Sequence, residues 1–487
     1  MTGVPLLTML LLAPVLGLAA VLIIPGSRPK AIKVAAALSG LAACVITLLI
    51  CLSFDSGHTG FQLVERVPWL PSIGISWHNG VDGISLPLLV LTSVVYLTGV
   101  LVMWELQERV KEYFAFMTLL VSGVFGVFMA LDLFFFLFWY EVAVLPMYLL
   151  IAIWGSTRKE YGAMKLTLYL LAGTALVVPA VLAVYWAAGL GTFDMTALAT
   201  AEYGHRFQLV VYPMLFVGFG ILAGMWPLHT WSPVGHVAAP TAVSMLHAGV
   251  LMKLGAYGIL RVGMVTLPEG AAYWSSVTAV LATINIVYGA FVALSQTDLK
   301  YVIGFSSVSH MGIVLLGLST RSVDGVNGAV FQMFAHGIMT ALFFASVGYI
   351  YDRYHTREIP RLGGLSRQVP VASAFFIVAA LTGAGVPGFA SFWAELLVFL
   401  GTLRTYPVLA AIVVAALVVT LAYSVRVIVQ AFLGEPREKH PVVPDIPPFL
   451  ALPRAILVAV LLVLGFYPRL ILDVIDPATR ALLGVLQ

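Results

Sequence analysis

Long apolar runs follow one another along almost the whole chain, separated by short polar segments. The first two runs cover residues 6–24 and 35–54. A helix that spans a bilayer needs about 20 apolar residues, so both runs are long enough to cross. Twelve further runs centre near residues 94, 122, 143, 176, 218, 251, 283, 309, 338, 386, 418 and 461, so the pattern predicts about fourteen spans.

The runs are continuous, whereas the strands of a membrane barrel alternate between apolar and polar positions. The pattern therefore predicts an all-α, polytopic membrane protein. The longest polar stretch, 55–83, leaves no room for a soluble domain. The first run lacks a basic start and a small-residue cleavage site, which indicates a retained span and not a signal peptide.

Composition agrees with this fold class. Of the 487 residues, 61% are hydrophobic and only 10% charged, whereas a soluble domain has about 25% charged residues. The net charge of +3 is too small for a nucleic-acid partner. Cys44 and Cys51 share one apolar run and are best interpreted as small apolar residues. Without a haem or iron–sulfur cysteine motif, redox chemistry is expected on another chain.

Basic residues in the loops predict the orientation of the chain. Fifteen lie in odd-numbered loops: Arg28, Lys30, Lys33, Arg109, Lys111, Arg158, Lys159, Lys300, Arg353, Arg357, Arg361, Arg367, Arg437, Lys439 and Arg454. Seven lie in even-numbered loops and the tail: Arg66, Arg206, Arg261, Arg321, Arg404, Arg469 and Arg480. The imbalance places odd loops in the cytoplasm and both termini on the outer side.

Several ionisable residues fall inside predicted spans, where they cost several kcal/mol and usually mark an ion or proton path. They are Glu141, Lys165, His247, Lys253, His310, His336, Glu395 and Arg426. Lys165 and Arg426 could instead extend to the interface. His247 could simply bond a helix carbonyl. Glu141, Lys253 and Glu395 have too many apolar neighbours on both sides for such an explanation.

Two apolar stretches contain helix breakers: GFGILAGMWPLH at 218–229 and LTGAGVPGF at 381–389. Both fall in long or interrupted spans, the seventh and the twelfth. Broken helices at matching positions of two halves indicate an inverted-repeat transporter, although a proline kink would look similar. We therefore expect N-terminal helices in 1–110, repeats of opposite orientation in 111–262 (spans 4–8) and 271–433 (spans 9–13), and a C-terminal fourteenth helix in 449–487.

Motifs along nearly the whole chain resemble one family. They are VDGISL at 81–86, FWYE at 138–141 with LPMY at 145–148, APTA at 239–242 with AGVLMKLGAYG at 248–258, QTDLK at 296–300, SSVSHMG at 306–312, His336-Gly337, RLGGL at 361–365, and GVPGF at 385–389 with Glu395. In this order they resemble the antiporter-like membrane subunits of respiratory complex I, the proton-pumping NADH:quinone oxidoreductase. The branch is that of chain M, or mitochondrial subunit 4.

The resemblance implies proton-transfer roles for particular residues. Glu141 matches the acid of the fifth helix, Lys253 the central lysine and Glu395 the acid of the far half-channel. Further positions on the hydrophilic axis match Lys165, His310, His336, His229 and His236. Protons would pass from the cytoplasm to the outside of a bacterial inner membrane. NAD, FMN, iron–sulfur clusters and quinone would lie on partner subunits, beside neighbouring antiporter-like chains.

Two positions depart from the family's pattern. Leu222 stands where the family usually has a lysine that pairs with the acid at Glu141, and Val234 replaces an aspartate. Three hypotheses follow. Another base, His229 or Lys165, replaces the missing lysine; or the chain is a partly silent, structural subunit; or the ion or the gating differs. His247, which replaces a common aliphatic residue, would belong to that last change.

Similar subunits also occur in multi-subunit cation/proton antiporters and in membrane-bound hydrogenase or formate-oxidising complexes. The sequence thus leaves three functions open: a redox-driven pump subunit, an antiporter subunit or a structural spacer. The chain ends soon after its fourteenth span, which disfavours the longer family branch with a surface-running C-terminal arm.

Overall fold

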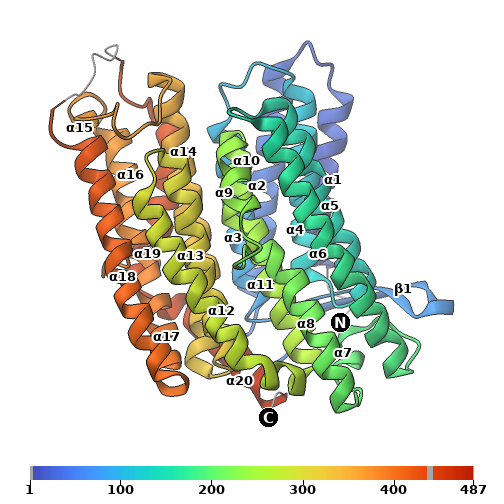
Figure 1. Cartoon of the computed structure of the whole chain (residues 1–487). Helices are drawn as coiled ribbons and strands as arrows, with labels where there is room; N and C mark the ends of the chain where they lie inside the picture. Colours follow the sequence, from blue (N-terminus) through green and yellow to red (C-terminus); the bar gives the residue numbers. More distant parts are fainter. Residues whose placement is uncertain (1–3, 436–442, 486–487) are drawn as a thin grey trace.

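The computed structural model describes residues 4–435 and 443–485 and is a bundle of membrane-length helices (Figure 1). Within these residues, thirteen helices are long and apolar enough to cross a membrane. The remaining predicted crossing is the twelfth, which consists of two shorter helices in sequence, α16 and α17. The prediction of an all-helical polytopic membrane protein with broken seventh and twelfth helices is confirmed.

The first half contains α1 (Leu6–Ile23), α2 (Pro29–Ser53), β1 (Gln62–Leu70), a 3₁₀ turn (Pro71–Ile73), β2 (Ile75–Val81), α3 (Ser85–Val102), α4 (Val110–Met129), α5 (Leu133–Trp154), α6 (Lys159–Ala188), α7 (Met195–Leu198), α8 (His205–Ala223), α9 (Trp231–Ala238), α10 (Thr241–Leu246), π turn η2 (His247–Leu251), α11 (Met252–Gly258) and π turn η3 (Ile259–Met264). The second half contains α12 (Pro268–Ser295), α13 (Leu299–Ser319), α14 (Val323–Tyr354), α15 (Leu365–Gln368), α16 (Pro370–Gly383), α17 (Ala390–Thr405), α18 (Pro407–Val427), π turn η4 (Ile428–Phe432), α19 (Pro448–Phe466) and α20 (Arg469–Val485).

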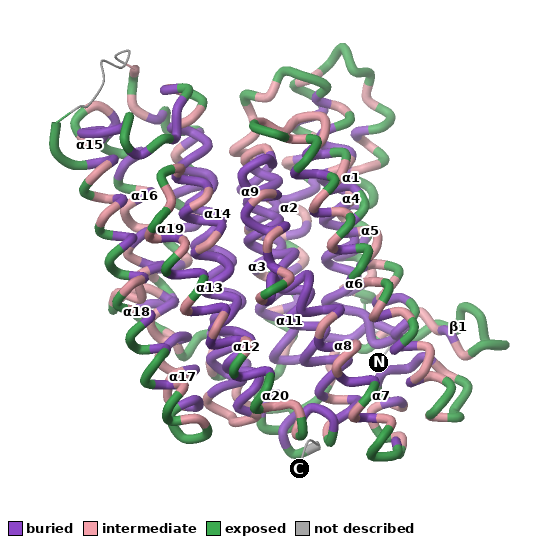
Figure 2. The backbone as a smooth tube through the Cα atoms, in the orientation of Figure 1, coloured by how far each residue is buried: buried purple, intermediate pink, exposed green. Residues whose placement is uncertain are grey.

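Burial separates central from peripheral helices (Figure 2). The apolar windows of α14 and of the segment Thr241–Met264 are completely buried, and that of α13 is 94% buried. Only a third of the corresponding windows of α1, α2, α6 and α18 is buried. Since the peripheral helices are still strongly apolar, their outer faces suit lipid or an apolar partner. Polar groups on the three central helices must find partners inside the bundle.

A two-stranded antiparallel hairpin, β1 with β2, occupies the polar stretch 55–83, which the sequence predicted only as a loop. It lies at the end of the bundle where the described chain begins and ends (Figure 1). Glu65 in β1 accepts hydrogen bonds from the backbone N–H groups of Leu7 and Thr8. A carboxylate there satisfies free N–H groups and favours the helix dipole. The hairpin therefore fixes the start of α1.

The segments 110–264 and 268–432 have the same order of elements: three long helices, an interrupted helix and a helix that contains π turns. The second helix of each begins at an aspartate, Asp132 or Asp298, whose side chain accepts from the next backbone N–H groups. Each aspartate also pairs with the loop after the third helix, at Asp194 and Glu358 respectively. We call each aspartate, with the loop residue that it pairs with, a corner of the fold. The two equivalent corners support two repeats, but the exact division of the repeats stays a prediction.

The C-terminal region contains two helices and not the single helix expected in 449–487. The fourteenth span is α19, and α20 is an additional amphipathic helix. Ile471 and Ile475 on α20 are buried. A Cβ on Gly83 would lie 1.9 Å from the carbonyl oxygen of Val474, so only glycine permits this approach of α20 to the start of α3. Because α20 mixes apolar and charged residues within seventeen positions, hydropathy alone did not separate it from the fourteenth span.

Five basic residues that were assigned to loops are buried and make specific contacts. Lys33, Lys300 and Arg454 donate to the backbone carbonyl oxygens of Trp104, Ala239 and Ala345 respectively. Arg357 and Arg261 form ion pairs with acidic side chains. They therefore act in helix packing as well as in the loop charge balance, and the membrane orientation stays a prediction.

The loop that contains Asp194 generates a test of stability. Burial raises the pKa of Asp194, but the nearby His78 and the Thr196 hydroxyl outweigh it and hold the pKa well below its usual range. Asp194 lies 3.0 Å from Arg66 and 3.3 Å from His78. A carboxyl with a lowered pKa stabilises the fold above its unfolded pKa, about 4, and loses this effect as the pH falls.

We expect Asp194→Asn to lower the free energy of unfolding by about 1 kcal/mol at pH 7. The difference from the unsubstituted protein should shrink as the pH falls below about 4. Thermal unfolding in detergent between pH 3 and pH 7 measures both quantities. The exposed Asp473 provides a control, since Asp473→Asn should change neither. A difference that is constant with pH would contradict the assignment.

Candidate functional site

A lysine and a histidine form the centre of the buried polar region. Lys253 on α11 and His336 on α14 are both fully buried, and Lys253 Nζ lies 2.6 Å from His336 Nδ1. Lys253 Nζ also donates to the carbonyl oxygen of Ala248 in the π turn η2. A π turn changes the α-helical hydrogen-bond pattern and often marks a functional position. Here it lets a carbonyl of the same helix bind the lysine.

His310 and Glu395 continue from this pair. The rings of His336 and His310 are stacked with centroids 5.3 Å apart, and His310 Nε2 lies 3.5 Å from Glu395 Oε1. His310 also contacts two backbone carbonyl oxygens: Ser306 at 2.7 Å from Nδ1, and Gly383 at 3.1 Å from Nε2. Both ring nitrogens therefore face acceptors. A protonated His310 can donate from either nitrogen, including toward the carboxylate.

The break between α16 and α17 creates the Glu395 end of this line. α16 ends at Gly383, so that its last carbonyls are free to face His310. Gly385 has a positive φ of 67°, and a Cβ there would lie 2.5 Å from Glu395 Oε2. The predicted breaker motif is thus a break that admits the carboxylate, and not an ordinary proline kink. We call Lys253, His336, His310 and Glu395 the polar line.

The polar line runs across the bundle. Lys253, His310 and His336 each lie about 12 residues inside a membrane-length segment. At 1.5 Å per residue this is about 18 Å from the segment's start, near the middle of a bilayer. The four groups come from four helices, α11, α14, α13 and α17. They connect sites within the membrane plane and do not by themselves reach either surface.

Many polar atoms around the line have no hydrogen-bond partner among the described residues. They include both ring nitrogens of His229 and of His247, His236 Nδ1, His336 Nε2 and the side-chain amide of Gln332. Buried polar groups are nearly always bonded to protein or water. Such a concentration is typical of a hydrated polar interior, which sequence reasoning located only through the histidines.

Glu141 lies apart from the polar line. It is only partly buried, on the face of α5 that also exposes Phe134, Phe138 and Leu145. Its carboxylate accepts a hydrogen bond of 2.7 Å from Thr174 Oγ1 on α6, and no ion pair joins it to a basic group in the described part of the chain. Neither His229 nor Lys165, the two bases proposed to replace the missing lysine, contacts this carboxylate directly.

Those two bases have other neighbours. Lys165 Nζ lies 5.8 Å and 6.0 Å from the ring centroids of Tyr161 and Tyr169. His229 is buried beside Tyr288, with ring centroids 4.9 Å apart. Leu222 is completely buried on α8. The hypothesis that His229 or Lys165 pairs directly with Glu141 is therefore not supported.

His236 belongs to a second group of imidazoles, on the segment between the broken helix and Lys253. Its Nε2 lies 3.0 Å from Ser232 Oγ, and its ring centroid lies 4.3 Å from that of His247. Val234, on the same short helix α9, lines a polar cavity of about 770 Å³ at the protein surface. Asp298, Arg357 and Glu358 line it as well. α9 therefore separates a surface cavity from the buried histidines.

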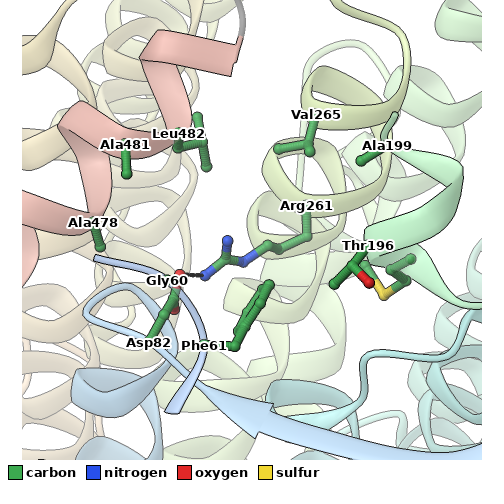
Figure 3. Close-up of a pocket in the computed structure, with 11 residues that line it drawn as sticks. Gly60, Phe61, Asp82, Thr196, Ala199, Arg261, Val265, Ala478, Ala481 and Leu482 are labelled. Atoms are coloured by element: carbon green, nitrogen blue, oxygen red, sulfur yellow. Dashed lines mark ion pairs between the residues drawn. The ribbon is translucent and has the colours of Figure 1, made fainter. Parts of the chain in front are cut away.

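A buried ion pair that sequence reasoning missed lies near the hairpin. Arg261 on η3 pairs with Asp82 before α3, at the base of a pocket of about 190 Å³ (Figure 3). The pocket wall includes Ala478, Ala481 and Leu482 of α20. The guanidinium carbon also lies 5.1 Å from the Phe61 ring. The only sequence signal was Asp82 inside the motif at 81–86.

Residues 130–420 match the family model described as NADH:quinone oxidoreductase/Mrp antiporter, TM, which is more than half of the chain. The chain belongs to this family. A NAD(P)H-quinone oxidoreductase chain 4 from Microcystis aeruginosa is 34% identical over 98% of this chain and 92% of the relative. Another, from Synechococcus elongatus, is 35% identical over 99% and 92%. The resemblance to an antiporter-like complex I subunit is confirmed.

Solved structures agree on the fold. A chain of respiratory complex I from Thermus thermophilus matches with a TM-score of 0.91 and 25% identity, over 99% of this chain and all of that one. A chain of the Mrp complex from Dietzia sp. DQ12-45-1b matches with a TM-score of 0.86 and 23% identity, over 99% of both. The second match concerns the fold alone.

The Asp82–Arg261 pair predicts a non-additive effect on stability. Arg261→Met leaves a buried carboxylate without its partner and should lower the free energy of unfolding by about 3–5 kcal/mol. Adding Asp82→Asn removes that charge and keeps the side-chain oxygen that accepts from the backbone N–H of Ser85 at the start of α3. We therefore expect the double variant to be more stable than the single variant Arg261→Met. Thermal unfolding in detergent measures this, and additive losses would contradict the coupling.

Proposed function

We propose that this chain is a proton-translocating, antiporter-like membrane subunit of a quinone oxidoreductase complex. The observation that supports this most strongly is the polar line Lys253–His336–His310–Glu395, which places four titratable side chains in sequence inside the bilayer. Such residues are costly there and persist chiefly in ion or proton pathways. The relatives' names supply the quinone-oxidoreductase context.

In this proposal a proton moves between neighbours on the line. Lys253 in its charged form donates to His336 Nδ1, and a proton that arrives on His310 passes from Nε2 to Glu395. The stacked rings of His336 and His310 exchange a proton through a water or after a ring rotation. His229 and His236 serve the side of Lys253 away from Glu395. Lys165 and Glu141 lie toward the α5–α6 face.

Glu141 indicates where a neighbouring subunit binds. A partly exposed carboxylate among Phe134, Phe138 and Leu145 would face lipid tails in an isolated chain, at a cost of several kcal/mol. Covering the α5 face with another antiporter-like chain removes that cost, and it gives Glu141 a route to groups outside this chain.

The remaining parts of the proposal concern the complex. The chain itself performs no redox step; NAD, FMN, iron–sulfur clusters and quinone are bound by partner subunits, and quinone reduction drives proton transfer here. The basic residues of the odd-numbered loops support an orientation with both termini on the outer side, and the bacterial relatives support a bacterial inner membrane as its location. The beginning and end of the described chain lie at the same end of the bundle, as this requires (Figure 1).

Lys253→Met tests the proposal directly. With the central cation removed, we expect proton pumping in inverted membrane vesicles to fall by about tenfold or more. Pumping is measured as quenching of a pH-sensitive dye during quinone reduction. Lys30→Met, at an exposed position in the first turn of α2, is the matched control and should pump normally. Normal pumping in Lys253→Met would leave a structural spacer as the function.

Affinity purification in mild detergent identifies the complex. Copurification with iron–sulfur quinone-reductase chains is the expected result. Purification with cation-antiporter chains alone would replace the redox-driven pump by a secondary antiporter subunit.

A further inference from the structure

His247 and His236 form a buried imidazole pair that the polar line does not include. His247 is 1% exposed and His236 is fully buried, with ring centroids 4.3 Å apart. They come from different elements, η2 and α9. The backbone of α9 passes close to His247, because a Cβ at Gly235 would lie in van der Waals contact with His247 Cε1, at 3.4 Å. The backbone of α9 can therefore pack directly against the His247 ring.

Three of the four ring nitrogens in this pair have no hydrogen-bond partner among the described residues. Each unsatisfied buried polar group carries a desolvation cost. Packing does not require this cost, because an aliphatic side chain of similar size would fill the site without it. His247 also does not bond a helix carbonyl, the simple structural alternative. Water can satisfy these nitrogens, and water between imidazoles also passes protons.

The surroundings connect the pair to both sides. His247 lies within electrostatic range of Lys253, and His236 within range of Lys253, Lys300 and His336. Lys300 opens α13 and bonds the carbonyl oxygen of Ala239, one residue beyond the end of α9. The neighbouring residues Asp298 and Tyr301 line the 770 Å³ polar cavity, as does Val234 on the outer side of α9.

We propose that His247 is a proton-transfer residue that, together with His236, carries protons between the polar cavity beside α9 and Lys253. This inference rests on the proposed function and adds a route from the surface to the polar line. Each imidazole accepts a proton on one ring nitrogen and releases one from the other, so its charge is restored after each transfer. The route bypasses the apolar Leu222 and does not require Glu141.

His247→Leu and His247→Gln test the inference in the complete complex, in inverted vesicles. Leucine removes the imidazole. Glutamine keeps a side chain that can form hydrogen bonds, but its amide does not take up a proton near neutral pH. We expect both to slow pumping by about tenfold or more. The solvent isotope effect in D₂O should increase, because proton delivery becomes rate-limiting. A purely structural role would not change that isotope effect.

His236→Leu should have the same effect, and the double variant His236→Leu with His247→Leu should be no slower than either single variant. Members of one pathway act as a unit and their losses do not multiply. Phe344→Leu is the control for packing, since its ring centroid lies 5.5 Å from that of His236 and it carries no proton. Native gels confirm that each variant assembles.

Normal pumping in His247→Gln, or multiplied losses in the double variant, would overturn the inference. Poor assembly of His247→Leu would move the decision to His247→Gln, which keeps polarity and size. Failure of the inference is distinguishable from failure of the proposed function. If Lys253→Met abolishes pumping while both His247 variants pump normally, only the route is wrong. If Lys253→Met pumps normally, the function itself is wrong.

Discussion

The contact between Lys253 and His336 is the interaction on which the rest of the interior depends. An amine at mid-membrane depth needs hydrogen-bond partners that the protein supplies in place of water. The imidazole nitrogen at 2.6 Å and a carbonyl of the π turn are those partners here. Both acceptors need fixed neighbours. The two residues lie in α14 and in the segment Thr241–Met264, whose apolar windows are completely buried.

Irregular helices provide the other acceptors. Regular helices use all their carbonyls internally, so a proton pathway in the membrane needs helix ends or altered turns. In this chain the π turn binds Lys253, and the end of α16 binds His310. The short helix α9 brings His236 to His247. These three polar contacts thus coincide with departures from regular α-helical geometry.

Sequence reasoning located the membrane crossings well, because hydropathy depends on local composition. It also found the breaker motifs and the four residues of the polar line, with the help of the family's motifs. It could not place Glu141 at a partly exposed face, since helix rotation is set by packing. It assigned Arg261 to a loop because its partner, Asp82, is distant in sequence. The hairpin and α20 were missed because both are short and partly polar.

The corners at Asp132 and Asp298 have a consequence for how the two halves differ. Each ties the start of one helix to the loop after the next, by the same backbone pairing. The halves are therefore secured alike, whereas their interiors differ: the second holds His310, His336 and Glu395, and the first holds Lys253 together with the apolar Leu222. Because the contact between Lys253 and His336 joins the two segments, the polar line is complete only when both are in place. A change in the packing between the halves would therefore interrupt the line without altering any of its residues.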